Sequence, residues 1–465
     1  MNTNLQSILN EAHECFCAGD LVRAEVLSRK VLAIVFNYSA SGSYNRLKES
    51  LQSCAEGVAA FNLLVSCLRR AGEKQGWIND ATVFPRRGLS WVRSRLFEHT
   101  QTVAYLGASV SAQRDSFVPL LHQKLCSLTG QSHESRVVGR GATGSMYALE
   151  SLESDVLIHQ PALCFIEYLT GDLNEGLTPW SEMESALEAL VVRISEHGCA
   201  VVFLHLFRGD YLLSEANRAL NTYEAVANRL GIPSIHAGRF LQRLILDGGV
   251  GYFDVIRDAV HTTAFGSELV SRFIAHRLSE LFWTGETLAH PSVPEPEGRR
   301  FRNIRLMPPG ACYSRFFGEW KGKRFVSLGP ELTEIEWVVE GYLLGVSVVV
   351  GPHSGVIQII SHGEVRTEVL WDHWCNTGGN RFRLVPVGKY FREQTRVVIR
   401  SKFYPVLPCG FCREVDSRGE VRPRHAPHRG EFLIQYECPC EEVLNVGTSQ
   451  RSALIVGLVV DAELG

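Results

Sequence analysis

The 465-residue chain is predicted to hold an α/β domain with a doubly wound parallel sheet, preceded by a helical module and followed by an antiparallel β-sandwich domain. Three observations predict this order. Apolar residues recur at helical spacing up to about residue 75. Apolar strands then alternate with helices of about 10 to 15 residues. After residue 300, short β-type runs follow one another without a helical period. We expect domains at 1–88, 89–284 and 301–465, joined by a linker at 285–300.

Composition indicates an ordinary folded protein and excludes several kinds of partner. Apolar residues make up 45% and charged residues 21% of the chain, and the net charge is −3, so no basic field for nucleic acid or an anionic membrane is present. The N-terminus lacks the charged and apolar regions of a secretory signal, and the longest apolar runs fall short of the roughly 20 residues of a membrane helix. We therefore expect a cytoplasmic protein with neither nucleic acid nor membrane as partner. An odd number of cysteines, 13, fits reduced thiols.

Residues 1–88 are predicted to begin with a helical hairpin that turns at Gly19-Asp20. With Ala12, Gly19 and Ala24 as small packing residues, this pair of helices resembles one tetratricopeptide-type unit. Two interpretations stay open. The module either binds a protein partner or packs as a plain helical bundle on the next domain.

The α/β domain is predicted from alternating apolar strands and amphipathic helices, which is typical of a parallel sheet. The expected strands are 103–106, 136–138, 162–166, 200–206 and 234–236, and the expected helices include 117–128, 183–194, 216–230 and 267–282. Beyond the Pro-rich linker, β-type runs at 324–328, 346–350, 356–360, 368–371, 396–399 and 453–460 predict the β-sandwich.

Three short segments carry the chemistry. Ser109 follows the first strand of the α/β domain, so it lies at the carboxyl edge of the sheet, where such folds bind ligands. The glycine-rich run 139–144 follows the second strand and offers backbone amides to an oxyanion. Asp258 and His261 follow the fifth strand, and this spacing lets the carboxylate orient the imidazole while His261 removes the Ser109 proton.

The order of these segments resembles the SGNH/GDSL hydrolase family of esterases, lipases and carbohydrate O-acylesterases, over about residues 103–282. The resemblance implies a three-layer α/β/α sandwich with a five-stranded parallel sheet. It implies Ser109 as nucleophile and as one oxyanion-hole amide, Gly144 as a second oxyanion donor, Asp258 as orienter and His261 as general base. No cofactor is expected for catalysis.

The sequence departs from the family pattern where an asparagine usually donates to the oxyanion. The segment Glu167 to Asn174 places Gly171 at that position. Losing one such donor typically costs about 2.7 to 4 kcal/mol of transition-state stabilisation. The Gly171 amide or the side chain of Asn174 is the candidate replacement.

Four cysteines suggest a structural zinc site. Cys409 and Cys412 form a Cys-x-x-Cys turn, and Cys438 and Cys440 follow about 25 residues later, with His425 or His428 as a substitute ligand. Reduced thiols or an inducible disulfide are the alternatives.

Together these observations predict a serine-dependent esterase or O-acyltransferase that acts on an acylated small molecule or glycan. The alternative is a weakly active or inactive glycan-binding or scaffolding protein that keeps the hydrolase fold.

Overall fold

The structure is a computed structural model. It describes residues 2–38, 58–60, 62–67, 70, 83–141, 143–173, 178–207, 218–257, 260–284, 301, 303–351, 354–370, 380–402, 413–415, 421–423 and 452–461. Three expected features lie outside these residues: the linker 285–300, the four cysteines of the zinc motif, and the side chains of Asp258 and Asn174. None of the helices within the described ranges combines the length and the apolar character needed to cross a bilayer.

The chain begins with the expected helical hairpin. Helices α1 (Asn2–Ala18) and α2 (Leu21–Tyr38) flank Gly19, whose φ of +84° lies in the left-handed region that glycine tolerates best. Ala12 and Ala24 are fully buried, as small packing residues should be. A role for this hairpin in binding a protein partner stays a prediction.

A six-stranded sheet forms the α/β domain, in the order β1-β6-β5-β4-β2-β3. Five strands are parallel, as expected: β2 (Thr102–Gly107), β3 (Glu134–Gly139), β4 (Leu163–Glu167), β5 (Ala200–Leu204) and β6 (Ser234–Ile235). The sixth, β1 (Val83–Phe84), pairs antiparallel with β6 at the edge. The sequence did not reveal this antiparallel edge strand, because two residues are too few to show a periodicity.

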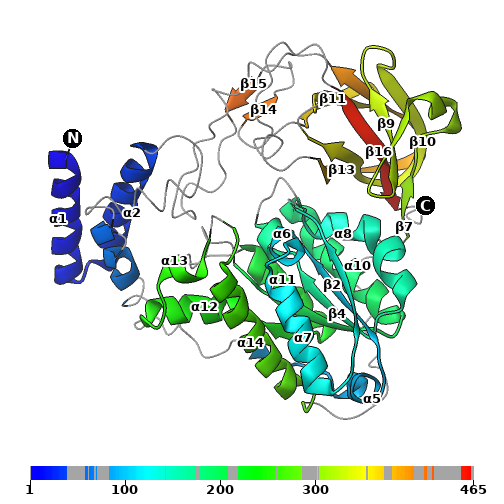
Figure 1. The fold of residues 1–465 in the computed structure, drawn as a ribbon. Coiled ribbons are helices and arrows are strands. Elements are labelled where there is room, and N and C mark those ends of the chain that lie inside the picture. The colour runs from blue at the N-terminus through cyan, green and yellow to red at the C-terminus, as the bar shows by residue number, and fades with distance from the viewer. Residues whose placement is uncertain are drawn as a thin grey trace.

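Helices cover both faces of this sheet and give the three-layer sandwich (Figure 1). Helix α7 packs on α14, and α14 on α12; on the other face α10 packs on both α8 and α11. The helices of this domain are α5 (Ser90–Glu98), α6 (Ser109–Ala112), α7 (Phe117–Thr129), α8 (Ser145–Ser151), α9 (Leu169–Asp172), α10 (Trp180–Glu196), α11 (Arg218–Leu230), α12 (Ala237–Leu246), α13 (Tyr252–Val255) and α14 (Ala264–Leu281). A π-helical turn, η1 (Leu152–Val156), and a 3₁₀ turn, η2 (Leu157–His159), follow α8.

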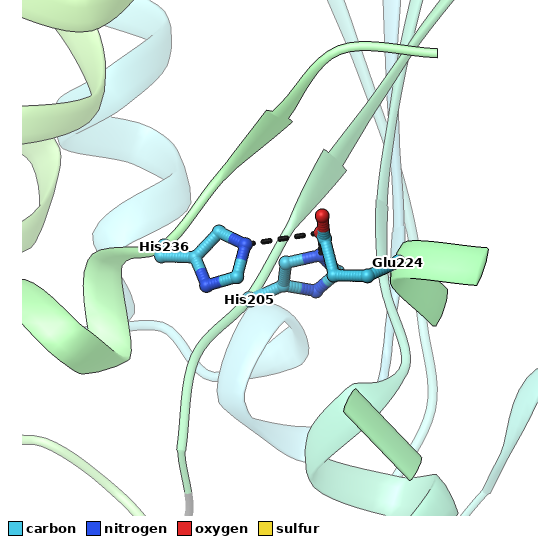
Figure 2. A group of neighbouring side chains, drawn as sticks. All are labelled: His205, Glu224 and His236. Atoms are coloured by element: carbon cyan, nitrogen blue, oxygen red, sulfur yellow. Dashed lines mark hydrogen bonds and ion pairs between the residues drawn. The ribbon is translucent and has the colours of Figure 1, made fainter. Parts of the chain in front are cut away.

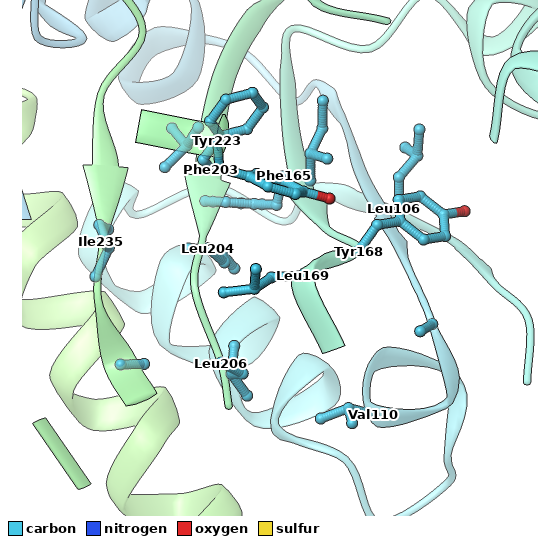
Figure 3. Packing of buried hydrophobic residues seen from close by; sticks show 14 of the residues in the cluster. Leu106, Val110, Phe165, Tyr168, Leu169, Phe203, Leu204, Leu206, Tyr223 and Ile235 are labelled. Atoms are coloured by element: carbon cyan, nitrogen blue, oxygen red, sulfur yellow. The ribbon is translucent and has the colours of Figure 1, made fainter. Parts of the chain in front are cut away.

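Polar contacts tie α11 to the carboxyl ends of two strands. His205 follows β5 and His236 follows β6, and both contact Glu224 of α11 (Figure 2). Apolar side chains fill the space behind them. Phe203 packs edge-on against Tyr223 of α11, with ring centroids 5.3 Å apart, and both rings are fully buried (Figure 3). Burying an aromatic ring of this size stabilises the fold by about 1.5 to 3 kcal/mol.

The C-terminal domain is antiparallel, as expected. Its strand order is β12-β11-β13-β10-β16-β9-β8, and β7 also pairs with β16. The strands are β7 (Ile304–Met307), β8 (Phe317–Trp320), β9 (Lys323–Leu328), β10 (Glu334–Val350), β11 (Val356–Ser361), β12 (Glu364–Val369), β13 (Arg381–Lys402) and β16 (Ala453–Asp461). A 3₁₀ turn, η4 (Ala311–Phe316), precedes β8, and a separate hairpin joins β14 (Arg413–Val415) and β15 (Val421–Pro423).

Strand β10 explains why the two domains hold together. Its first half alternates between buried and exposed residues, whereas residues 341–350 are all buried. Leu343 and Val346 enter the core of the β-domain, while Tyr342 and Leu344 join the core of the α/β domain. Because successive side chains of a strand point to opposite faces, β10 is buried on both faces where it lies between the two cores.

The β-domain lies next to α8 (Figure 1), and charged and aromatic side chains complete this interface. Lys323 of β9 binds Glu150 of α8, whose side chain is fully buried, with Nζ 3.2 Å from Oε1. Burial raises the pKa of Glu150, and the Lys323 ammonium opposes that shift. Phe382 of β13 stacks on Tyr147 of α8, and the guanidinium of Arg140 lies 4.6 Å from the centroid of the Phe382 ring.

We predict that replacing Lys323 by Met lowers the free energy of unfolding by about 3 to 5 kcal/mol, because the substitution leaves a buried carboxylate unpaired. The double variant Lys323→Met, Glu150→Met should regain most of that loss. Urea unfolding measures both values, and Arg396→Gln, which breaks an exposed pair with Glu336, serves as control and should cost less than about 1 kcal/mol. A double variant less stable than the single one would contradict this account of the interface.

Candidate active site

Three strands end at one level beneath the site. Gly107 at the end of β2 pairs with Gly139 of β3 on one side and with Glu167 of β4 on the other. The segments that follow these residues therefore begin side by side at the carboxyl edge of the sheet. This placement brings together the segments that follow β2, β3 and β4, among them the turn at Ser109 and the glycine-rich run.

The Ser109 turn needs glycine at both neighbouring strand ends. A Cβ on Gly107 would lie 2.3 Å from Ser111 Oγ, and one on Gly139 would lie 2.8 Å from the Cβ of Ala112. With hydrogen at both positions, α6 lies directly across the ends of the strands. Ser109 is the first residue of α6, so its N–H has no acceptor within the helix and is available to an oxyanion.

Hydrogen bonds and an ion pair hold the segment around His261 next to Ser109. The Arg257 amide donates to the His261 carbonyl at 2.8 Å, and the Arg257 guanidinium binds the Asp115 carboxylate at 2.7 Å. Ser267 of α14 also donates to the Asp115 carbonyl, at 3.1 Å. As a result His261 Nε2 lies 2.9 Å from Ser109 Oγ, and both residues are only partly buried. Asp258, the expected orienter, lies outside the described residues.

Gly144 occupies the N-cap of α8, where a buried carboxylate fixes the backbone. Asp172 accepts hydrogen bonds from the Ser145 amide at 2.8 Å and from the Tyr223 hydroxyl at 2.7 Å. Burial raises the pKa of Asp172, and these hydrogen bonds oppose the shift. A Cβ on Gly144 would lie 2.3 Å from Asp172 Oδ1 and 2.2 Å from Thr178 Oγ1. The absence of a side chain therefore lets the Gly144 peptide pack directly against Asp172 and Thr178.

Gly171 does not replace the missing asparagine with its own amide. Its N–H donates to the Tyr168 carbonyl at 2.9 Å, so the amide that the sequence offered as a donor is already engaged. A Cβ here would lie 2.0 Å from the Thr143 carbonyl oxygen. The residue is thus a glycine because the peptide that precedes Gly144 packs directly on it. Asn174, the other candidate, lies outside the described part of the chain.

Glu167 stabilises the turn that carries Ser109, a role that the sequence did not reveal. Its carboxylate accepts from Ser111 Oγ at 2.9 Å and from Thr170 Oγ1 at 2.7 Å, and its carbonyl accepts from the Ala108 amide. Burial raises the pKa of Glu167 to about 7, against the lowering effect of the two hydroxyl donors. Asp172, Tyr223 and Arg257 were missed as well, because only the folded chain brings them to the site.

We predict that the titration of Glu167 makes the protein less stable as the pH rises from about 4.5 to 7. The Glu167 carboxyl loses its proton near pH 4.5 in the unfolded chain and near pH 7 in the folded chain. Between these values the folded chain binds more protons, so the free energy of unfolding falls as the pH rises. Relative to Glu167→Gln, the wild-type free energy of unfolding should fall by about 3 kcal/mol over that interval and stay level above it. Urea unfolding at several pH values measures the difference, with the exposed Glu98→Gln as control. If the free energies of unfolding of wild type and Glu167→Gln changed with pH in the same way, the raised pKa of Glu167 would be disproved.

Comparison with known proteins identifies the fold. Neither a protein-family model nor a curated protein matches the sequence. Among solved structures, a two-domain esterase (CEX) active on acetylated mannans is 16% identical, with a TM-score of 0.58 over 82% of this chain and 97% of that chain. The same esterase co-crystallised with mannopentaose gives the same values. The acetyl xylan esterase AlAXEase is 15% identical and covers 38% of this chain and 98% of its own, with a TM-score of 0.34. The chain therefore shares the fold of that two-domain structure, an α/β domain followed by a β-rich domain.

Proposed function

We propose that the chain is a serine-dependent esterase that removes acyl groups, acetyl in particular, from a carbohydrate. The observation that carries this proposal is the 2.9 Å contact between Ser109 Oγ and His261 Nε2 at the carboxyl edge of the sheet. A serine hydroxyl in hydrogen-bond contact with an imidazole is the pair needed to activate a nucleophile.

In the proposed reaction, Ser109 Oγ attacks the carbonyl carbon of the ester while His261 Nε2 takes the hydroxyl proton. The ring proton must then sit on Nδ1, the nitrogen that we propose Asp258 to bind. Collapse of the tetrahedral intermediate expels the sugar alkoxide, which receives the proton from His261. Water, activated by His261 in turn, then hydrolyses the acyl-serine and releases the carboxylic acid.

The negative oxygen of the intermediate is proposed to lie between the amides of Ser109 and Gly144. Ser109 is the first residue of α6 and Gly144 is the N-cap of α8, and the dipole at the N-terminus of a helix favours negative charge. Asp172 fixes the second of these amides by holding the adjacent Ser145 amide. The site then works with backbone donors, without the asparagine side chain that the family pattern includes.

The carbohydrate substrate is inferred from the shared two-domain fold. The solved structure that this chain matches over 82% of its length is described as active on acetylated mannans. In our chain the β-domain packs on α8, the helix whose N-cap supplies Gly144, through Lys323 and Phe382. We therefore propose an acetylated polysaccharide or oligosaccharide as substrate, held near both domains.

We predict that Ser109→Ala and His261→Ala each lower kcat/KM for acetate release by about 1,000-fold or more. Acetylated mannan, acetylated xylan and an aryl acetate are the substrates, and released acetate is the signal. Matched controls are Ser127→Ala and His276→Ala, two exposed residues on α7 and α14 that should keep wild-type activity.

The outcomes separate the competing functions. Hydrolysis of the aryl acetate alone would keep the esterase and remove the glycan substrate. Transfer of acetyl to a sugar hydroxyl in place of water would identify an O-acyltransferase. Glycan binding without Ser109-dependent hydrolysis of any ester would contradict the proposal and favour the inactive binding protein.

We also predict that Gly171→Asn, which restores the usual family residue, lowers activity instead of raising it. The new Cβ would collide with the Thr143 carbonyl and displace the Gly144 peptide, so we expect a loss of about 100-fold or more in kcat. Gly130→Asn, at an open left-handed position that ends α7, is the control and should leave kcat unchanged. A gain in kcat for Gly171→Asn would show that the oxyanion hole is incomplete as it stands.

A further inference from the structure

Two imidazoles and one carboxylate converge on a single point away from the Ser109–His261 pair. His205 Nε2 lies 2.8 Å and His236 Nε2 3.0 Å from the same oxygen, Oε1 of Glu224 (Figure 2). The three potential ligand atoms all lie within 4.8 Å of one another. Three separate elements supply them: the ends of β5 and β6, and α11.

The chemistry of the three groups suits metal coordination. Both imidazoles are fully buried, and the side chain of Glu224 is 18% exposed. Two imidazoles and one carboxylate are a ligand set that binds zinc and similar divalent ions.

Without a metal, Glu224 Oε1 accepts hydrogen bonds from both imidazoles, so each ring carries its proton on Nε2. The Nδ1 atoms of His205 and His236 are buried and have no hydrogen-bond partner within the described ranges. Each ring can therefore move its proton from Nε2 to Nδ1 when a cation takes Nε2.

Arg86 orients the carboxylate from the opposite side. Its guanidinium lies 2.5 Å from Glu224 Oε2, and it also donates to Asn228 Oδ1 and to the Ile232 carbonyl, each at 2.8 Å. This leaves Oε1 alone to face the imidazoles, and such outer contacts commonly hold a metal-ligating carboxylate in place. Because the Arg86 charge partly offsets Glu224, we expect weaker binding than at a site of four thiolates.

We propose that His205 Nε2, His236 Nε2 and Glu224 Oε1 bind a divalent transition-metal ion of the zinc type. With three protein ligands, at least one coordination position remains for water. Glu224 is partly exposed and gives the ion a path of entry. Strands β5 and β6 lie two and three strands from β2, so the site is separated from the Ser109 strand by roughly 10 to 15 Å along the sheet edge. The ion would pin α11 to two strand ends without taking part in ester hydrolysis.

The test uses the full chain with Cys409→Ser and Cys412→Ser, which removes the other candidate metal site. After treatment with a chelator, the protein is titrated with Co²⁺ and followed by absorption. We expect one equivalent to produce visible d–d bands without a thiolate charge-transfer band. At free metal about 100-fold above Kd, the Tm should rise by about 5 °C or more. X-ray absorption of the Zn²⁺-loaded chain should show imidazole scattering and a nitrogen–oxygen shell at about 2.0 to 2.1 Å.

Glu224→Gln and His236→Gln, which preserve most of the side-chain volume, should each weaken Co²⁺ binding by at least about 100-fold. His133→Gln is the matched control, because His133 is also buried but contacts Thr129 outside the cluster. Absence of the Co²⁺ spectrum and of the Tm shift in the starting protein would overturn the proposal without any further variant. Equal affinity in Glu224→Gln and in the control would overturn it too, as would a shell without imidazole.

Discussion

The site depends on three neighbouring strands that end in register, two of them at a glycine. Gly107 is flanked in register by Gly139 and Glu167, and a Cβ on either glycine would strike α6. Only this arrangement lets the short helix that begins at Ser109 lie flat across the edge of the sheet. Every later requirement, the reach of His261 and the placement of the amides, starts from that position of α6.

Buried carboxylates near the site act as ties between backbone segments. Glu167 holds the Ser109 turn through Ser111, and Asp172 holds the N-terminus of α8 through the Ser145 amide. The β-domain contacts the same helix near its C-terminal end, where Lys323 binds Glu150. Gly144 is the N-cap of α8. Because the β-domain packs on α8, it helps to fix the position of this proposed oxyanion donor.

The sequence predicted the elements whose signals are local. Strong periodicity gave the parallel strands, the longer helices and the antiparallel character of the second domain, and chain order suggested Ser109 and His261. It could not reveal β1, whose two residues show no period, nor why residues 341–350 are buried on both faces. It also missed Asp172 and the His205–Glu224–His236 group, since residues that meet only after folding leave no regular spacing in the chain. Gly171 looked like a lost donor, whereas the structure shows that this position cannot accept a side chain.

A structure of the protein treated with an alkyl phosphonate, an analogue of the tetrahedral intermediate, tests the central claim most directly. We expect phosphorus bonded to Ser109 Oγ, His261 Nε2 within hydrogen-bond distance of the adduct, and one phosphonate oxygen about 2.7 to 3.1 Å from the amides of Ser109 and Gly144. An adduct whose oxygen avoids both amides would contradict an oxyanion hole built from backbone donors. Failure of the phosphonate to bond to Ser109 would contradict the nucleophile itself.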